Sequence, residues 1–249
     1  MIILKSPHEI EKMRRVGKFV AEILAILTEK VAPGVTTRSL NEIAEAESAK
    51  RNARPAFKGY GGDPYSLCCS PNDGVVHGMP TVKPLQEGDI ISLDFGLVVD
   101  GYYGDAAVTL PVGKVTAQAE KLLEVTRCSL DSAISAAVPG NRLHDVSSAV
   151  QKFVEQHGFS VVRDFVGHGI GTQLHESPQV PNFGRAGTGP LLKSGMVLAI
   201  EPMVNQGKYT IKVLEDGWTA VTADGSLSAH FEHTVAITDN GPEILTQLN

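Results

Sequence analysis

The sequence repeats its own order of elements, and this repeat constrains the fold more than any other feature. A helical stretch ends at Ala32-Pro33-Gly34, and another ends 106 residues later at Val138-Pro139-Gly140. The segments Leu85–Gly88 and Leu192–Gly195 stand 107 residues apart, and each leads into an apolar strand. Self-similarity at a nearly fixed spacing indicates a duplicated unit. We therefore expect one domain over residues 1–249 with two halves, about 32–110 and 138–240, related by a pseudo-twofold axis.

Residues 88–110 read as two β-rich runs joined by Asp100-Gly101, the preferred pair for a two-residue hairpin turn. This turn pairs Val99 with Tyr102, so Asp94 lies opposite Ala107 and Asp105 opposite Gly96. Side chains alternate between faces, which makes Asp94 and Asp105 diagonal neighbours on one face, about 7–8 Å apart. The hairpin contains no Lys or Arg to neutralise the two carboxylates. A metal ion is the simplest counter-charge.

The second half offers matching carboxylates. Asp89–Asp94 aligns with Met196–Glu201, so Glu201 is the counterpart of Asp94, and Asp105–Leu110 finds a plausible counterpart in Glu232–Ile237. A twofold axis would bring all four carboxylates around one site. Glycine-flanked His168 adds an imidazole, and such a mixed set suits Mn, Fe or Co better than structural Zn. Four carboxylates favour two divalent ions about 3.5–4 Å apart with a hydroxide between them, which describes a dinuclear hydrolase.

Apolar residues at helical spacing predict four helices that complete each half. Their cap and stop residues give the ranges about 7–31, 37–52, 116–137 and 143–157. A glycine-rich loop, Gly59–Pro64, and a short β-like piece, Leu67–His77, lie between the second helix and the hairpin. The order indicates an α+β fold with a central antiparallel sheet.

Composition narrows the class of protein. The net charge is −6, which argues against a sequence-specific nucleic-acid binder. No apolar run reaches the roughly 18–20 residues that cross a bilayer, and the N-terminus has no signal-peptide pattern. The three cysteines, two of them adjacent, fit reduced thiols in the cytoplasm better than a disulfide framework.

The motifs taken together resemble those of the type I methionine aminopeptidases, which have the pita-bread fold. The resemblance covers nearly the whole chain and rests on four motifs: the Asp94-x10-Asp105 hairpin, Gly167–Gly171, Ile200-Glu201-Pro202 and Phe231–Thr234. It implies two pseudo-twofold-related halves around a curved antiparallel sheet. It also implies that Asp94 binds one metal ion, that Asp105 and Glu232 bridge two ions, and that His168 and Glu201 complete the second.

The same resemblance implies roles for further residues. His77 would contact the substrate near its N-terminus, His175 would polarise the scissile carbonyl, and Glu201 would shuttle a proton. Tyr60, Cys68 and Trp218 fall where the family builds its methionine pocket, together with His77 and His175. Asn72 and Ser228 fall where family members bind a structural monovalent cation. The chain departs from the family at three positions near the substrate: Asp63, Asp73 and Leu174.

Simpler interpretations exist for several of these residues. Asp94 and Asp105 alone could be solvated carboxylates, His175 alone a loop residue, and Trp218 alone a core residue. The other histidines carry no motif of their own, and we expect them to be structural or on the surface: His8, His144, His157, His230 and His233. His233 follows a predicted ligand but should point to the opposite face of its strand.

The resemblance implies removal of the initiator methionine from nascent chains with a small second residue. The alternatives are an Xaa-Pro peptidase of the same fold, which usually carries an extra N-terminal domain, and a non-catalytic binding protein. Expected partners are the N-termini of nascent polypeptides. The basic helix face that contains Lys12, Arg14, Arg15 and Lys18 could also touch ribosomal RNA. We expect a cytoplasmic monomer with two divalent metal ions and a bound monovalent cation.

Overall fold

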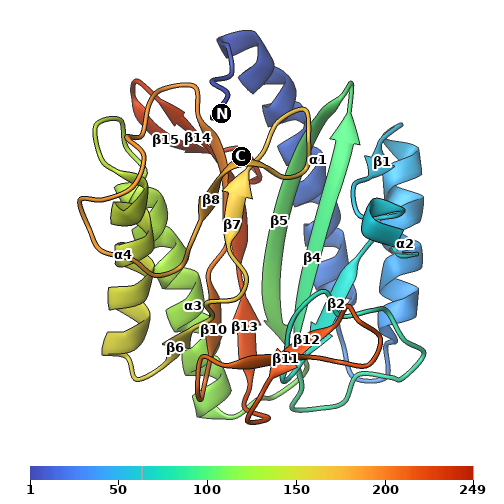
Figure 1. The fold of residues 1–249 in the computed structure, drawn as a ribbon. Coiled ribbons are helices and arrows are strands. Elements are labelled where there is room, and N and C mark those ends of the chain that lie inside the picture. Colours follow the sequence, from blue (N-terminus) through green and yellow to red (C-terminus); the bar gives the residue numbers. More distant parts are fainter. Residues whose placement is uncertain (63, 249) are drawn as a thin grey trace.

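A curved antiparallel sheet forms the centre of the computed structural model, which describes residues 1–62 and 64–248 (Figure 1). Within these residues the sheet has nine strands in the order β1-β4-β5-β14-β9-β7-β8, with β2 paired to β4 and β15 to β14. The strands are β1 (Arg54–Pro55), β2 (Cys68–Pro71), β4 (Ile90–Val99), β5 (Tyr102–Pro111), β7 (Gly167–Gly169), β8 (Glu176–Val180), β9 (Val197–Ile200), β14 (Glu232–Thr238) and β15 (Gly241–Ile244). The expected α+β pita-bread fold is confirmed.

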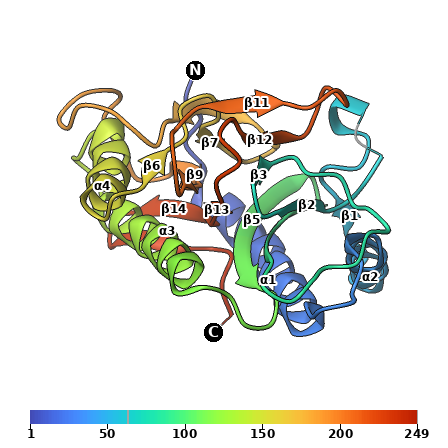
Figure 2. The same cartoon turned by 90° about the horizontal axis from the view of Figure 1, so that it is seen from below.

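Two small sheets complete the described strands. One has the order β13-β10-β6 and the other the order β11-β12-β3. Their strands are β3 (Gly74–Val76), β6 (Ser160–Val161), β10 (Met203–Asn205), β11 (Ile211–Val213), β12 (Ala220–Thr222) and β13 (Ser228–His230). Figure 2 shows the four helices on one face of the central sheet and the β11-β12-β3 sheet on the other.

The helices follow the predicted ranges closely. In the described part of the chain they are α1 (Pro7–Lys30), α2 (Thr37–Lys50), α3 (Ala117–Ala136) and α4 (Leu143–Gln156), and a 3₁₀ turn spans Tyr60–Gly62. Ser6 and Glu9 form a capping box at the start of α1, with Pro7 at the first helical position. None of these helices is both long and apolar enough to span a bilayer.

The helices bury most of their apolar residues in two cores, one for each half, while the start of α1 contributes to a third cluster. Residues of α1 and α2, including Val20, Leu27 and Leu40, pack against β4 and β5. Residues of α3 and α4, including Leu122 and Val150, pack against β9 and β14. Each half therefore has a hydrophobic core of its own, and the sheet joins the two.

The hairpin register agrees with the prediction. Asp94 pairs with Ala107 and Asp105 with Gly96, and the turn residues Asp100 and Gly101 have φ values of 51° and 80°. Positive φ at both central residues is the type I′ geometry that the right-handed twist of the two strands favours. Asp94 and Asp105 consequently share one face of the hairpin.

Equivalent hydrogen bonds relate the two halves. The amide of Gly34 donates to Leu85 at 2.8 Å, and the amide of Gly140 donates to Leu192 at 3.1 Å. The sheet pairing, however, corrects the alignment of the last strands. Asp94 on β4 pairs with Ala107 on β5, and the β9–β14 register, continued by one pair, places Glu201 opposite Glu232. Because Asp94 and Glu201 are counterparts, Ala107 is the counterpart of Glu232.

The predicted match of Asp105 with Glu232 is therefore two residues out of register, and the counterpart of Asp105 is His230. Side-chain hydrogen bonds support this correction. The Thr234 hydroxyl bridges the amide and carbonyl of Asp105, and the Thr109 hydroxyl bridges the amide and carbonyl of His230. The identity of the acidic residues had suggested the wrong strand register.

Candidate active site

A cavity of about 190 Å³ lies between the hairpin and the strands of the second half. The structure brings all the expected metal-binding and substrate-binding residues to it, apart from the monovalent cation pair. Its lining consists of Asp94, Asp105, His168, Glu201 and Glu232, together with Phe57, Tyr60, Cys68, Val76, His77, Phe165, Val166, Leu174, His175 and Trp218.

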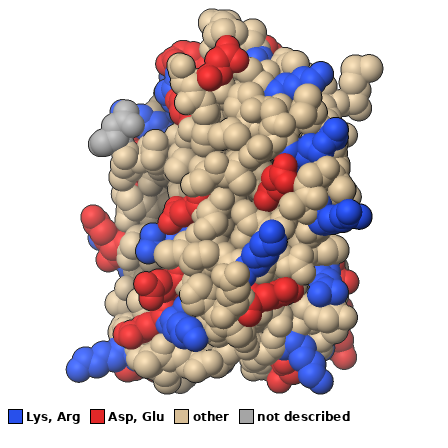
Figure 3. Space-filling model, turned by 90° about the vertical axis from the view of Figure 1, so that its left-hand side faces the viewer, with Lys and Arg blue, Asp and Glu red and all other residues tan. Residues whose placement is uncertain are grey.

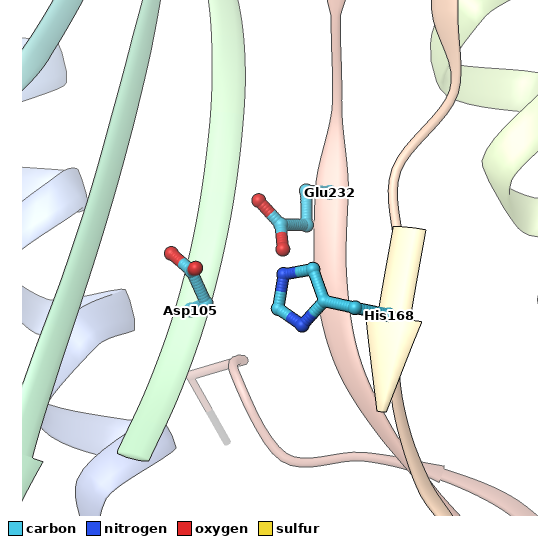
Figure 4. Close-up of side chains that lie close together, drawn as sticks. All are labelled: Asp105, His168 and Glu232. Carbon is cyan, nitrogen blue, oxygen red and sulfur yellow. The ribbon is translucent and has the colours of Figure 1, made fainter. Parts of the chain in front are cut away.

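Three of the expected ligands come from three different strands and point toward one another (Figure 4). Asp105 lies on β5, Glu232 on β14 and His168 on β7, and one donor atom from each lies within 4.8 Å of the others. Glu201 follows β9, and its Oε1 is 3.5 Å from the Nε2 of His168. At this separation both groups could bind the same divalent metal ion.

The carboxylates are buried, and hydrogen bonds offset little of the cost of burying them. Asp94 Oδ1, Asp105 Oδ1 and Glu232 Oε1 are buried without a hydrogen-bond partner among the described residues. Burial raises the pKa of Asp105 to about 7. Burial, followed by the charge of Asp105, raises the pKa values of Asp94 and Glu232 well above their usual range. Burial, followed by the charge of Asp94, raises the pKa of Glu201 in the same way. A divalent cation would relieve these costs.

The orientation of His168 also fits a metal ligand. Its Nδ1 lies 2.9 Å from the carbonyl oxygen of Gly169, which can only accept a hydrogen bond. The proton is therefore on Nδ1, and the lone pair of Nε2 faces the carboxylates. Burial, and then the charge of His175, lowers the pKa of His168 to about 4, which keeps the ring neutral. The donor set and its unpaired atoms thus fit a divalent metal site.

Two further histidines lie beside the carboxylates. The ring of His175 lies edge to face with that of His168, with centroids 4.3 Å apart, and its Nδ1 is 2.6 Å from the hydroxyl of Tyr60. The ring of His77 lies between those of Phe165 and Trp218. His77 has a φ of 60°, a strained value for a residue with a Cβ, and such strain is frequent at functional sites.

The outer part of the cavity is apolar and contains a thiol. Cys68 is buried there, Tyr60 and Trp218 form aromatic walls, and Leu174 is 3% exposed. Sulfur and aromatic rings make favourable contacts with a thioether. Asp73 lies outside this wall, where its carbonyl accepts from the amide of Thr222. The predicted departure at Asp63 lies outside the described residues.

The expected monovalent cation pair lies away from the cavity. The amide of Ser228 donates to the carbonyl of Asn72 at 2.9 Å, while the Ser228 hydroxyl contacts Asn205. The Asn72 side chain bonds to Asp89 and to the amide of Ile90. The two residues are neighbours, and their side chains already have protein partners.

The structure places one histidine at the site that sequence reasoning assigned to the structural or surface class. His230 is 1% exposed, and its Nε2 lies 3.6 Å from Oε2 of Glu201 and has no hydrogen-bond partner within residues 1–62 and 64–248. Burial lowers its pKa to about 3. Only the strand register, which makes His230 the counterpart of Asp105, could have signalled this position. His233 points away from the site to Thr246, as expected.

Comparisons with known proteins agree with this geometry. The family model of metallopeptidase family M24 matches residues 11–239. A protein named methionine aminopeptidase from Clostridium perfringens is 56% identical over 246 residues, which are 99% of this chain and 99% of that protein. The crystal structure of a methionine aminopeptidase from Thermotoga maritima is 52% identical, covers 100% of both chains and superposes with a TM-score of 0.98.

A more distant structure shares the fold alone. The prolidase of Pyrococcus horikoshii is 22% identical with a TM-score of 0.81, and the match covers all of this chain but 65% of the prolidase. The full-length similarity to methionine aminopeptidases and the five converging side chains point the same way. The chain therefore belongs to metallopeptidase family M24, in the branch formed by the methionine aminopeptidases.

Proposed function

We propose that this enzyme removes the N-terminal methionine from polypeptides whose second residue is small. The observation that carries the proposal is the juxtaposition of unpaired, buried carboxylate oxygens with an apolar pocket that contains a thiol. Asp94, Asp105, His168, Glu201 and Glu232 would hold two divalent ions. When bound, these ions would supply Lewis acidity and activate water near neutral pH.

The protein's own groups would orient the substrate and move protons. Oε2 of Glu201 does not face His168 and could accept a proton during attack and return it to the leaving amine. The Tyr60 hydroxyl can donate to Nδ1 of His175, which leaves a proton on Nε2 to donate to the scissile carbonyl. His77 would contact the peptide near the scissile amide.

The pocket beside these groups would select the side chain. Tyr60, Cys68 and Trp218 would contact the thioether of methionine. Leu174 offers a smaller wall than an aromatic residue, so we infer a somewhat wider pocket that tolerates norleucine and leucine better. A small second residue is required because the two histidine rings border the path of the departing chain.

The finer properties of the centre are also part of the proposal. An oxygen-rich set with one imidazole favours Co, Mn or Fe over Zn. Asn72 and Ser228 would hold a monovalent cation through backbone oxygens. Residues 1–249 would act as one catalytic unit, a cytoplasmic monomer that meets chains as they leave the ribosome. On the face shown in Figure 3, acidic and basic side chains are interspersed, which gives no support to a nucleic-acid surface there.

The test uses three peptides and a metal series. The protein is stripped of metal and reloaded with Mn, Co or Fe, and cleavage of Met-Ala, Met-Lys and Ala-Pro peptides is measured. We expect activity only with metal and only on the Met-Ala peptide. Cleavage of Ala-Pro without cleavage of Met-Ala would replace the proposal with an Xaa-Pro peptidase. Metal binding without cleavage of any peptide would favour a binding protein.

A further inference from the structure

Lys5 and Glu176 form a buried ion pair that joins the N-terminal segment to the loop of His175. The Lys5 Nζ lies 2.5 Å from Oε2 of Glu176, and the two side chains are only 4% and 6% exposed. The residues are 171 positions apart in the sequence. The N-terminal segment lies near β7 in both ribbon views (Figure 1, Figure 2).

The second oxygen of Glu176 closes the loop itself. Oε1 accepts from the amide of Thr172 at 2.8 Å and from the amide of Gln173 at 3.2 Å. The loop 172–176, which carries His175, is therefore tied across its base by one carboxylate. Lys5 contacts the other oxygen of that carboxylate, so the Glu176 carboxylate anchors both the lysine and the loop.

The surroundings leave this anchor little freedom. A Cβ built at Gly171 would lie 2.4 Å from Cε of Lys5 and 2.6 Å from Oε1 of Glu176, so a larger residue there would have to displace the ion pair. The Lys5 amide donates to the carbonyl of Gly195 at 2.7 Å, and the Tyr103 amide donates to the carbonyl of Gly171 at 2.8 Å. The ion pair is thus fixed to both halves of the molecule.

We propose that Lys5 and Glu176 are positioning residues that fix the backbone of His175 against the reacting carbonyl. The proposal rests on the proposed function, in which His175 donates to that carbonyl. The ring of His175 contacts Tyr60 and His168, and these contacts act on the side chain, not on the backbone of the loop. A donor that acts on the developing negative charge matters more in the transition state than in the bound substrate.

The first test replaces the lysine by a side chain of similar length. Lys5→Met leaves the Glu176 carboxylate buried without its cation, which is the most damaging state of a buried pair. We expect kcat for a Met-Ala peptide to fall roughly 10- to 100-fold, as for a misplacement of about 1 Å, with KM changed less than about twofold. Activities are compared at a temperature below the thermal unfolding midpoint of every variant.

A double variant separates the charge from the loop contacts. In Lys5→Met/Glu176→Gln no charge remains, and the amide oxygen can still accept from Thr172 and Gln173. We expect this variant to recover part of the kcat that Lys5→Met loses. The control is Arg14→Met, which removes the pair between Arg14 of α1 and Glu243 of β15. It should lower stability and leave kcat unchanged.

A readout that needs no turnover completes the test. With ¹³C-labelled histidine, the ring resonance missing in His175→Ala is followed in each metal-free variant. It should shift and broaden in Lys5→Met but stay in place in Arg14→Met. An unchanged kcat or an unchanged His175 resonance in Lys5→Met would overturn the proposal. Failure of the wild type to cleave Met-Ala would instead overturn the proposed function, and the resonance would still decide whether the pair positions the loop.

Discussion

Two neighbouring histidine rings in the site differ in the kind of hydrogen-bond partner that their Nδ1 atom contacts. Nδ1 of His168 faces a carbonyl, which requires a donor, whereas Nδ1 of His175 faces the Tyr60 hydroxyl, which can itself donate. The first arrangement leaves a lone pair on Nε2 and the second leaves a proton there. One residue type can therefore serve as a metal ligand and as a hydrogen-bond donor at adjacent positions.

This assignment makes the Tyr60 hydroxyl testable on its own. Tyr60→Phe keeps the ring in the pocket wall and removes the donor, so His175 loses the partner that fixes its tautomer. We expect kcat to fall about fivefold, as for one hydrogen bond of about 1 kcal/mol, with a smaller change in KM. Steady-state kinetics on a Met-Ala peptide measure it.

The matching control is a double-mutant cycle. In a His175→Ala background, Tyr60→Phe should have no further effect on kcat, because the bond that it breaks no longer exists. Additive losses would show that the hydroxyl acts on the substrate directly rather than through His175.

The sequence could indicate His168 but not His230, and the difference lies in local context. Glycines on both sides of His168 signal a close backbone approach, while His230 stands in an ordinary strand, Ser228–His230. The proximity of His230 to Glu201 arises only from pairing between strands distant in the sequence. Side chains that gain their role through register have no local signal.

At the level of elements, the junction between β5 and β14 is short. Its backbone ladder consists of two residue pairs among the described residues, Glu232 with Ala107 and His233 with Ala106. Threonine hydroxyls extend it at each end, from Thr234 to Asp105 and from Thr109 to His230. On the side of β14, the backbone of the expected bridging ligand Asp105 is therefore held by a threonine side chain and not by the backbone of a strand partner.

Removing that hydroxyl should weaken metal binding. Thr234→Val keeps the shape and deletes both bonds to Asp105, which loosens one expected bridging ligand relative to Glu232. Loss of a partner that orients a ligand typically costs 10- to 100-fold in metal affinity. Calorimetric titration of the stripped protein with Mn should show a loss of about this size.

Serine supplies the control for this variant. Thr234→Ser retains the hydroxyl and should bind Mn with nearly the wild-type affinity, although it removes a buried methyl group. If Ser and Val variants weaken metal binding equally, packing of the methyl group and not the hydroxyl bonds orients Asp105.

The two hairpin-like pairs show what strand patterns can and cannot predict. The register of β4 and β5 follows from a tight turn whose residues, Asp100 and Gly101, are visible in the sequence. β9 and β14 are joined by a long excursion through β10 to β13, so no turn sets their register. The register predicted from the turn was consequently right in the hairpin, whereas the match of Asp105 with Glu232 by their acidic side chains was wrong by two positions.

For the whole molecule, the buried cluster should control how stability depends on pH when metal is absent. The folded pKa of Asp105 is raised to about 7, so its contribution to stability is present below the unfolded value and is lost as pH rises through 7. The folded pKa of His168 is lowered to about 4, so its contribution has the opposite sign and is complete above 6.5. Above pH 6.5, only the buried carboxylates of this cluster still make the stability depend on pH.

We therefore expect the metal-free protein to lose stability as pH rises from about 6.5 through about 7, because the folded carboxyl groups still hold protons that the unfolded chain has already released. Urea midpoints across this range measure it, and bound Mn should abolish the decline. Asp105→Asn should raise the midpoint of the metal-free protein at the alkaline end while preventing tight metal binding. A midpoint that rises with pH in metal-free wild type would contradict the expected effect of the cluster.

Long-range pairing marks the limit of prediction for the molecule as a whole. The expected ligands could be named because each stands in a motif such as Ile200-Glu201-Pro202. The partnership of Lys5 with Glu176 could not, since neither residue has a distinctive neighbourhood and 171 positions separate them. The motifs thus predicted the expected metal ligands, whereas the residues that position the loops of the site depend on contacts between distant segments.

The short junction of β5 and β14 has a consequence for motion. Amides that bond to a threonine hydroxyl, as those of Asp105 and His230 do, are released by one side-chain rotation instead of by separation of strands. Ions bound across the junction would block that rotation by fixing the carboxylates on both sides. Loss of metal should then appear first as faster deuterium uptake confined to this line of amides, while the two hydrophobic cores remain protected.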